Sequence, residues 1–281
     1  MGIKVVSNSE VKKYMRRNFY EIIKGAGINI TNEYNRINEL FESTELSADS
    51  VRDSIESAFL DFPKSFRGRT VSLDDFDSTY GFKKIGFASD VSIEELLSRC
   101  EYITNLCNQL CKCWDSTLDV SDWLSIRLLT ETIEGCIDEL GFVPAKIEDF
   151  VIYVEKDSAA ISVAEIVPEQ LAFVVLEYNH HKLKGDLNKK RQLLKEMADN
   201  IEPERKRLRS INSTLETQLC QLMNKFIRHD HSQTPFIVTM KKQEIESTYD
   251  DIYQMWLLAK LELDNLERKN RMQGLLEKIN S

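Results

Sequence analysis

The stretch at 203–226, PERKRLRSINSTLETQLCQLMNKF, has the most regular helical pattern in this chain. Its apolar side chains recur three or four positions apart, the spacing that places them on one face of an α-helix: Leu208, Ile211, Leu215, Leu219, Leu222 and Phe226. Proline is tolerated in the first turn of a helix, so we expect this helix to begin at Pro203. The stretch therefore predicts one regular helix that packs along a continuous apolar seam.

A second seam of the same kind follows a connector at 227–242. It consists of Ile245, Tyr249, Ile252, Trp256, Ala259, Leu263 and Leu266. Two such faces in one chain can pack against each other in a helical bundle, or against a second copy of the chain. The sequence leaves both arrangements open.

Most of the chain before these two seams also has helical periodicity. Helices are expected at 10–24, 31–41, 47–62, 92–111, 121–140, 158–167, 168–184 and 185–200. The one convincing strand is 150–155, and the non-periodic stretch 63–90 is expected to be a structured loop with short strands that could pair with it. We predict a mainly α protein, a multi-helix bundle with a small β element in the middle of the chain. A soft boundary divides it into domains at 1–142 and 143–281.

Composition narrows the class of protein. Hydrophobic residues make up 42% of the 281 residues and charged residues 30%, which is a soluble globular balance. The net charge of -9 argues against a dedicated nucleic-acid coat protein. No stretch approaches the roughly 18 apolar residues of a membrane span, so no membrane partner is expected.

Six cysteines without a CxxC pair favour reduced thiols, buried as small hydrophobic side chains in the cytoplasm, over a zinc site. The acidic run Asp74, Asp75 and Asp77 lacks the glycine and terminal glutamate of a calcium loop, which favours a solvated turn. We expect neither a bound metal nor a cofactor.

The histidines are the candidate catalytic residues, because all four fall into two pairs, His180-His181 and His229-Asp230-His231. Histidine is the side chain that exchanges protons near neutral pH. His229 comes seven residues after Leu222, so it continues the first seam to the end of its helix, where it could act as an acid or base. Two other interpretations are a histidine that caps the helix end and a metal site built from both pairs.

The charge changes sign around His229. Twelve lysines and arginines stand against six acidic residues between Tyr178 and Arg228, an excess of six positive charges. The densest part holds four candidate phosphate-binding residues, Arg205, Lys206, Arg207 and Arg209. A solvated helix face is one interpretation, and a surface that attracts phosphate is the other.

The stretch 219–231, LCQLMNKFIRHDH, resembles a HEPN domain, the helical bundle of many bacterial defence and toxin ribonucleases. The helix at 249–259 supports the resemblance, which covers at most about the last 120 residues and extends to bacterial abortive-infection proteins. HEPN ribonucleases carry an arginine and then, four to six positions later, a histidine. They cleave RNA without a metal, usually as dimers.

The resemblance implies that His229 is the general acid/base for attack by an RNA 2′-hydroxyl, with Asn224 as the polar residue of the motif. His231 is the neighbouring catalytic candidate, and Lys225 and Arg228 would hold phosphate. The chain departs from the pattern because no arginine occupies 222–224, and Arg228 is adjacent to the histidine. Either Arg228 supplies the phosphate contact, or the domain is a non-catalytic module. Such a module would form a homodimer or bind a partner protein through its helical seams.

Overall fold

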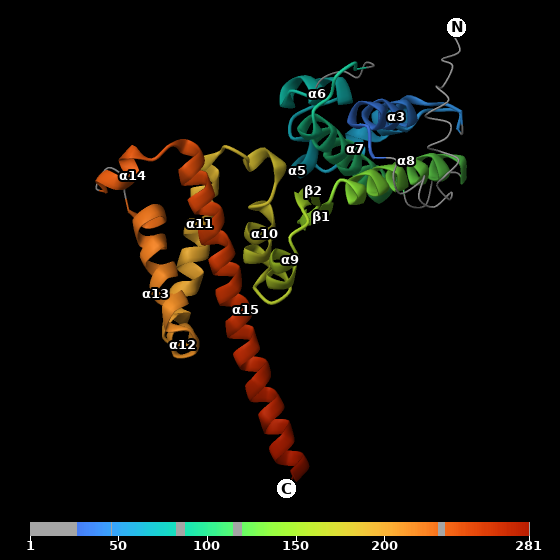
Figure 1. The fold of residues 1–281 in the computed structure, drawn as a ribbon. Helices are drawn as coiled ribbons and strands as arrows, with labels where there is room; N and C mark the ends of the chain where they lie inside the picture. The colour runs from blue at the N-terminus through green and yellow to red at the C-terminus, as the bar shows by residue number, and fades with distance from the viewer. Residues whose placement is uncertain (1–26, 46, 83–87, 115–119, 230–233, 281) are drawn as a thin grey trace, which may run out of the picture. The chain divides into compact units, whose positions relative to one another are not determined.

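The computed structural model describes residues 27–45, 47–82, 88–114, 120–229 and 234–280 (Figure 1). The helix expected at 10–24 lies outside these residues. The chain divides into two compact units, Met1–Leu140 and Gly141–Ser281. The division falls two residues before the boundary expected from the sequence, and helices dominate each unit, which confirms the prediction of a mainly α protein.

Helices, joined by short loops, are the only regular elements among the described residues of the first unit. Its elements are α3 (Ile30–Glu42), α4 (Val51–Ala58), η1 (Phe59–Asp61), α5 (Lys64–Arg67), α6 (Leu73–Tyr80), α7 (Ile93–Trp114) and α8 (Val120–Glu139). Aromatic residues fill much of the core between them. The buried Asp77 of α6 accepts a 2.6 Å hydrogen bond from Tyr102 of α7, which fixes these two helices to each other.

The expectation of strands within 63–90 is wrong for the residues described there, which form the short helices α5 and α6. The Ser72 side chain accepts a hydrogen bond from the Asp75 N–H, and Asp74 and Asp75 lie in the first turn of α6. Acidic residues are favourable at this end of a helix because of the helix dipole. The acidic run is therefore neither a calcium loop nor the solvated turn expected from the sequence; it begins a helix.

The strand at 150–155 pairs within its own unit. β2 (Phe150–Glu155) forms an antiparallel hairpin with β1 (Phe142–Ile147), in which Phe142 lies opposite Glu155. Residues 63–90 were therefore the wrong partner. The turn contains Glu148, which has a left-handed φ of 48°.

The rest of the second unit is a helical bundle. Its elements are α9 (Ser158–Ala164), α10 (Glu169–Glu177), η2 (His181–Leu183), α11 (Leu187–Ile201), η3 (Glu202–Glu204), α12 (Arg205–Ile211), α13 (Ser213–Leu222), η4 (Met223–Arg228), α14 (Pro235–Thr239) and α15 (Lys242–Asn280). The single helix expected at 203–226 is broken at Asn212, whose side chain accepts a hydrogen bond from the Leu215 N–H. Asparagine competes for backbone hydrogen bonds inside a helix and caps the next one.

The two seams pack against each other inside one chain. Their shared core includes Leu208, Leu215, Leu219, Phe226, Tyr249, Ile252, Trp256, Ala259 and Leu263. The Trp256 indole N–H also donates a 2.9 Å hydrogen bond to the Met197 carbonyl of α11. The seams are therefore used within the chain, and an external partner must contact another surface.

Helix α15 is long enough to continue beyond this core. It has 39 residues, of which Leu263 is the last that is buried. Figure 1 shows α15 extending past α12 and α13 of its own unit towards the C-terminus. None of the helices in the described part of the chain combines the length and hydropathy needed to cross a membrane.

Candidate functional site

The region of the HEPN-like motif is a π-helical turn. Helix α13 continues directly into η4, in which the His229 N–H donates to the Asn224 carbonyl at 3.1 Å. A π turn closes over five residues instead of four, and such turns are frequent at functional sites. Because the turn is wider, residues 224 and 225 lie on the same side of the helix as residue 229. The His229 side chain is exposed.

Arg191 of α11 holds the end of this turn. Its Nε donates to the Ile227 carbonyl at 3.0 Å, and its Nη2 donates to the His229 carbonyl at 2.5 Å. The last carbonyls of a helix have no partner within the helix, so an arginine is a favourable cap. In the sequence, Arg191 is only one of the twelve positive residues, since nothing in its local pattern reveals a contact 38 residues away.

Arg228 is directed towards α11 and η3. Its Nη1 lies 2.7 Å from Glu202 Oε2, and its Nη2 donates to the Ala198 carbonyl at 2.8 Å and contacts Asp199 at 3.2 Å. Hydrogen bonds from Arg228 and Arg205 lower the pKa of Glu202 below its ordinary range. Three acceptors therefore engage the guanidinium that the resemblance assigns to phosphate.

The arginines of α12 are also engaged by carboxylates. Arg205 Nε and Arg209 Nη2 each lie 2.8 Å from a different oxygen of Glu216, whose side chain is fully buried. Arg207 pairs with Glu204 at 3.3 Å and with Glu267 of α15 at 2.8 Å. Burial alone would raise the pKa of Glu216, but the hydrogen bonds from Arg205 and Arg209 outweigh it and the pKa is lowered.

These pairs change the interpretation of the positive excess. Glu267 lies outside the span in which the charges were counted, as do Glu246 and Asp250, which lie 3.0 and 2.8 Å from Lys190. Much of the excess is thus balanced by α15. Of the candidate phosphate-binding residues, Lys206 and Lys225 are exposed, and neither forms an ion pair within the described part of the chain.

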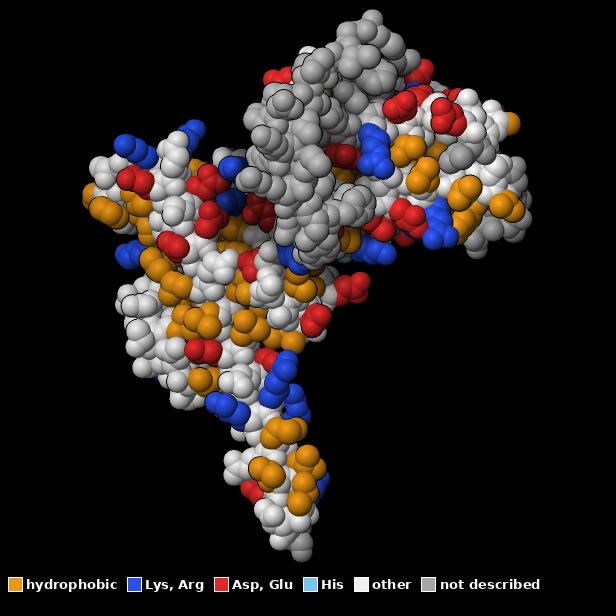
Figure 2. Space-filling model, turned by 45° about the vertical axis from the view of Figure 1, so that its right-hand side comes forward, with side chains coloured by type: hydrophobic (Ala, Val, Ile, Leu, Met, Phe, Trp, Pro, Cys, Tyr) orange, Lys and Arg blue, Asp and Glu red, His pale blue; other side chains and the backbone are white. Residues whose placement is uncertain are grey.

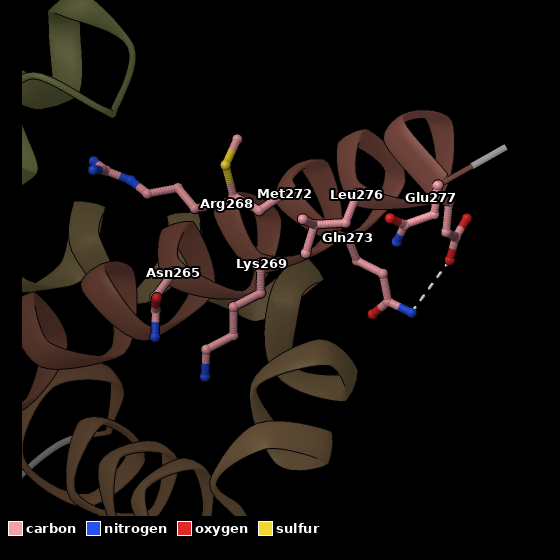
Figure 3. A pocket seen from close by; sticks show the side chains of 8 residues that line it. Asn265, Arg268, Lys269, Met272, Gln273, Leu276 and Glu277 are labelled. Carbon is pink, nitrogen blue, oxygen red and sulfur yellow. Dashed lines mark hydrogen bonds between the residues drawn. The ribbon is translucent and has the colours of Figure 1, made fainter.

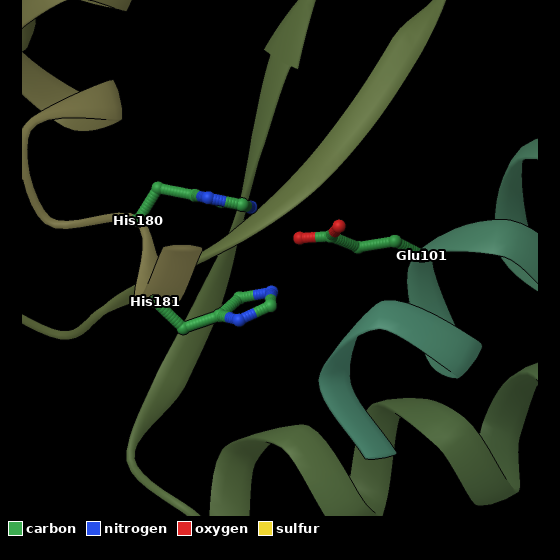
Figure 4. A group of neighbouring side chains, drawn as sticks. All are labelled: Glu101, His180 and His181. Carbon is green, nitrogen blue, oxygen red and sulfur yellow. The ribbon is translucent and has the colours of Figure 1, made fainter. Parts of the chain in front are cut away.

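His180 and His181 differ from His229 in their surroundings. His180 and His181 lie side by side at η2, with ring centroids 4.3 Å apart (Figure 4). His180 Nδ1 accepts from the Lys182 N–H at 3.3 Å, and the His180 backbone forms a β-bridge with Val154. His229 belongs to no cluster of three metal-ligating side chains among the described residues. The candidate His231 lies outside them.

A polar cluster without a sequence signal joins the buried Tyr178 and Lys190 to the half-exposed Asp250. The Tyr178 hydroxyl donates to Asp250 at 2.9 Å, Lys190 Nζ lies 2.8 Å from the same carboxylate oxygen, and the Tyr178 ring stacks on Tyr253 with centroids 4.2 Å apart. Burial and Asp250 raise the pKa of Tyr178 far above its ordinary value. The tyrosine therefore stays protonated, and the cluster joins α10, α11 and α15.

The terminal segment of α15, residues 264–280, was also missed. Met272, Leu275, Leu276 and Ile279 are 55%, 50%, 58% and 67% exposed. Figure 2 shows apolar and basic side chains together on this end of the helix, and Figure 3 shows Asn265, Met272 and Leu276 lining an open groove along it. The signal was the spacing of Met272, Leu275 and Ile279, which are three and four residues apart; it begins six residues after Leu266.

Comparison of the chain with protein-family models, with curated proteins and with solved structures finds no match.

Proposed function

We propose that the chain is a non-catalytic helical subunit that associates with another protein chain in the bacterial cytoplasm. The resemblance of residues 219–231 to HEPN domains suggests a phage-defence or toxin complex as its setting. The observation that carries the proposal is the terminal segment of α15. Apolar side chains there are half exposed or more on a helix that has already passed its own core.

The contacts that hold Arg228 favour association with another chain over catalysis. A ribonuclease of this kind needs a positive group at the scissile phosphate to stabilise the charge that develops there. Arg228 is held by Glu202, Asp199 and the Ala198 carbonyl. Redirecting it towards RNA would break these contacts, so Asp199 would lose its arginine and Glu202 would keep only Arg205.

A metal-independent endoribonuclease is the second candidate, and one observation favours it. The π turn brings Asn224, Lys225 and the exposed His229 to neighbouring positions, so an imidazole and a free ammonium group are both accessible to solvent. In this mechanism His229 would take the proton from the RNA 2′-hydroxyl and Lys225 would contact the phosphate.

RNA cleavage by the purified chain in the presence of EDTA separates the two candidates. The non-catalytic proposal expects the wild type and His229→Ala to leave a labelled RNA equally intact. Cleavage by the wild type that yields 2′,3′-cyclic phosphate ends and is lost in His229→Ala would overturn it in favour of the ribonuclease. Lys146→Ala, which alters an exposed lysine of β1 outside every candidate phosphate-binding position, is the matched control.

A further inference from the structure

Helix α15 has two opposite apolar faces. One is buried in the bundle through Tyr249, Ile252, Trp256 and Leu263. The other carries Met272, which comes nine residues after Leu263. At about 100° per residue this places the two side chains on opposite sides of the helix, roughly 180° apart. Beyond Leu263, the exposed face is therefore separate from the one that the bundle uses.

The second face follows a heptad pattern, with side chains alternately three and four positions apart. We call this set the outer stripe: Leu258, Leu261, Asn265, Arg268, Met272, Leu275 and Ile279. Its a positions are 258, 265, 272 and 279, and its d positions are 261, 268 and 275. Leu258 is 48% exposed, whereas Leu261 is partly buried and packs against the bundle core, so the stripe begins at the edge of the bundle and becomes fully accessible only beyond it.

We propose that a second copy of this chain occupies the outer stripe and forms a parallel two-stranded coiled coil over residues 258–279. This inference rests on the proposed function and names the partner. In the parallel arrangement each a position faces its own copy, so the amide of Asn265 meets an identical amide and both can be satisfied by hydrogen bonds. One asparagine at an a position is a known determinant of register and oligomeric state.

The charges beside the stripe fit the same arrangement. Asp264 is at a g position and Lys269 is at the following e position, and these positions lie next to each other across a parallel dimer. Asp264 Oδ2 already accepts from Arg268 of the same helix at 2.5 Å, which leaves Oδ1 for the lysine of the second copy. The pair forms twice because of the twofold symmetry.

Other occupants fit less well. An antiparallel pair places a positions opposite d positions, so Asn265 would not face its copy. Residues 264–280 hold four cations (Arg268, Lys269, Arg271 and Lys278) and three anions (Asp264, Glu267 and Glu277). This mixture differs from the strongly basic polar face of helices that lie on anionic membranes. The helix is also already nucleated by the bundle, so the second copy need not induce it.

Sedimentation equilibrium of the full chain over a range of concentrations tests the proposal. The wild type is expected to be a reversible dimer, and Leu275→Lys is expected to weaken it about 100-fold or more, since a buried leucine is lost from both copies. Val238→Lys, at a 62% exposed position of α14, is the matched control and should leave the dimer intact. Circular dichroism establishes that each variant is folded.

Cysteine cross-linking tests the orientation. Met272→Cys, at an a position, should form an intermolecular disulfide on mild oxidation, since facing a positions are close enough in a parallel pair. Glu277→Cys, at an outward f position, should not. The wild type, which keeps its six native cysteines, gives the background.

Each outcome decides the proposal. A monomeric wild type, or a dimer unaffected by Leu275→Lys, overturns the second copy as the occupant. A Leu275-dependent dimer that Met272→Cys does not cross-link overturns the parallel orientation. The non-catalytic function fails by a different result, RNA cleavage that depends on His229, so the two failures can be told apart.

Discussion

Arg228 Nη1 lies 2.7 Å from Glu202 Oε2, so the arginine beside the candidate histidine joins the end of η4 to the start of η3. The same guanidinium caps the Ala198 carbonyl, and its side chain is 25% exposed. We expect Arg228→Met to lower the free energy of unfolding by about 1–2 kcal/mol, because charge-assisted hydrogen bonds are lost. Lys225→Met, at an exposed position in the same turn, should change it by less than about 0.5 kcal/mol. Urea unfolding measures both, and equal effects would contradict a structural role for Arg228.

The buried Glu216 predicts an acid-sensitive contact. Its pKa is lowered from 4.5 in the folded state, so its contribution to stability is complete above pH 4.5 and is lost as the pH falls through the folded-state value. We expect Glu216→Gln to reduce stability at pH 7 by about 1–2 kcal/mol and to flatten the loss of stability below pH 4.5. Urea midpoints at pH 7 and pH 3.5 provide the measurement. A variant that loses as much stability on acidification as the wild type would exclude this assignment.

The Lys190 ammonium is nearly buried and bridges Glu246 and Asp250. Lys190→Met removes the shared cation from two carboxylates and from the Tyr178 hydroxyl cluster. We expect a loss of about 2 kcal/mol, below the full value for a buried pair because Asp250 is half exposed and can be hydrated. The neighbouring Lys189 pairs with Glu177 nearer the surface, and Lys189→Met should cost less than about 1 kcal/mol. Thermal unfolding of the two variants under the same conditions distinguishes them.

The opposite faces of α15 predict opposite consequences for two leucines. Leu263→Ala creates a cavity in the bundle core and should lower the free energy of unfolding by about 2–4 kcal/mol. Leu275→Ala should change it by less than about 0.5 kcal/mol at protein concentrations where the chain is monomeric. Unfolding curves at low concentration test this pair. A large loss for Leu275→Ala there would mean that its side chain packs within its own chain.

The helical fold could be predicted from the sequence because long helices carry a periodic signal. The seams containing Leu219 and Trp256 were recognised, and both residues are buried where those seams meet. The errors occurred where a few local residues decide the structure. Ser72 begins a short helix within an aromatic-rich stretch, and β1 was overlooked because Pro144 and Lys146 interrupt its pattern.

The candidate site was less predictable because its geometry depends on distant contacts. The sequence places Arg228 and His229 next to each other, and the structure sends the arginine towards Glu202 and Asp199, 26 and 29 residues earlier in the chain. The same limit applies to Arg205 and Glu216. Local charge counting detects that these groups are present, but only the folded bundle determines which carboxylate each cation meets.

The parallel pairing of two α15 helices would determine how many binding surfaces the dimer presents on one side. In a parallel pair both chains enter the coiled coil from the same end, so two copies of every bundle surface lie at that end. A target with repeated epitopes at matching separation could then be held by both copies at once. The second contact would form at the high effective concentration set by the first. The terminal segment of one helix would in this way convert a weak single contact into bivalent recognition.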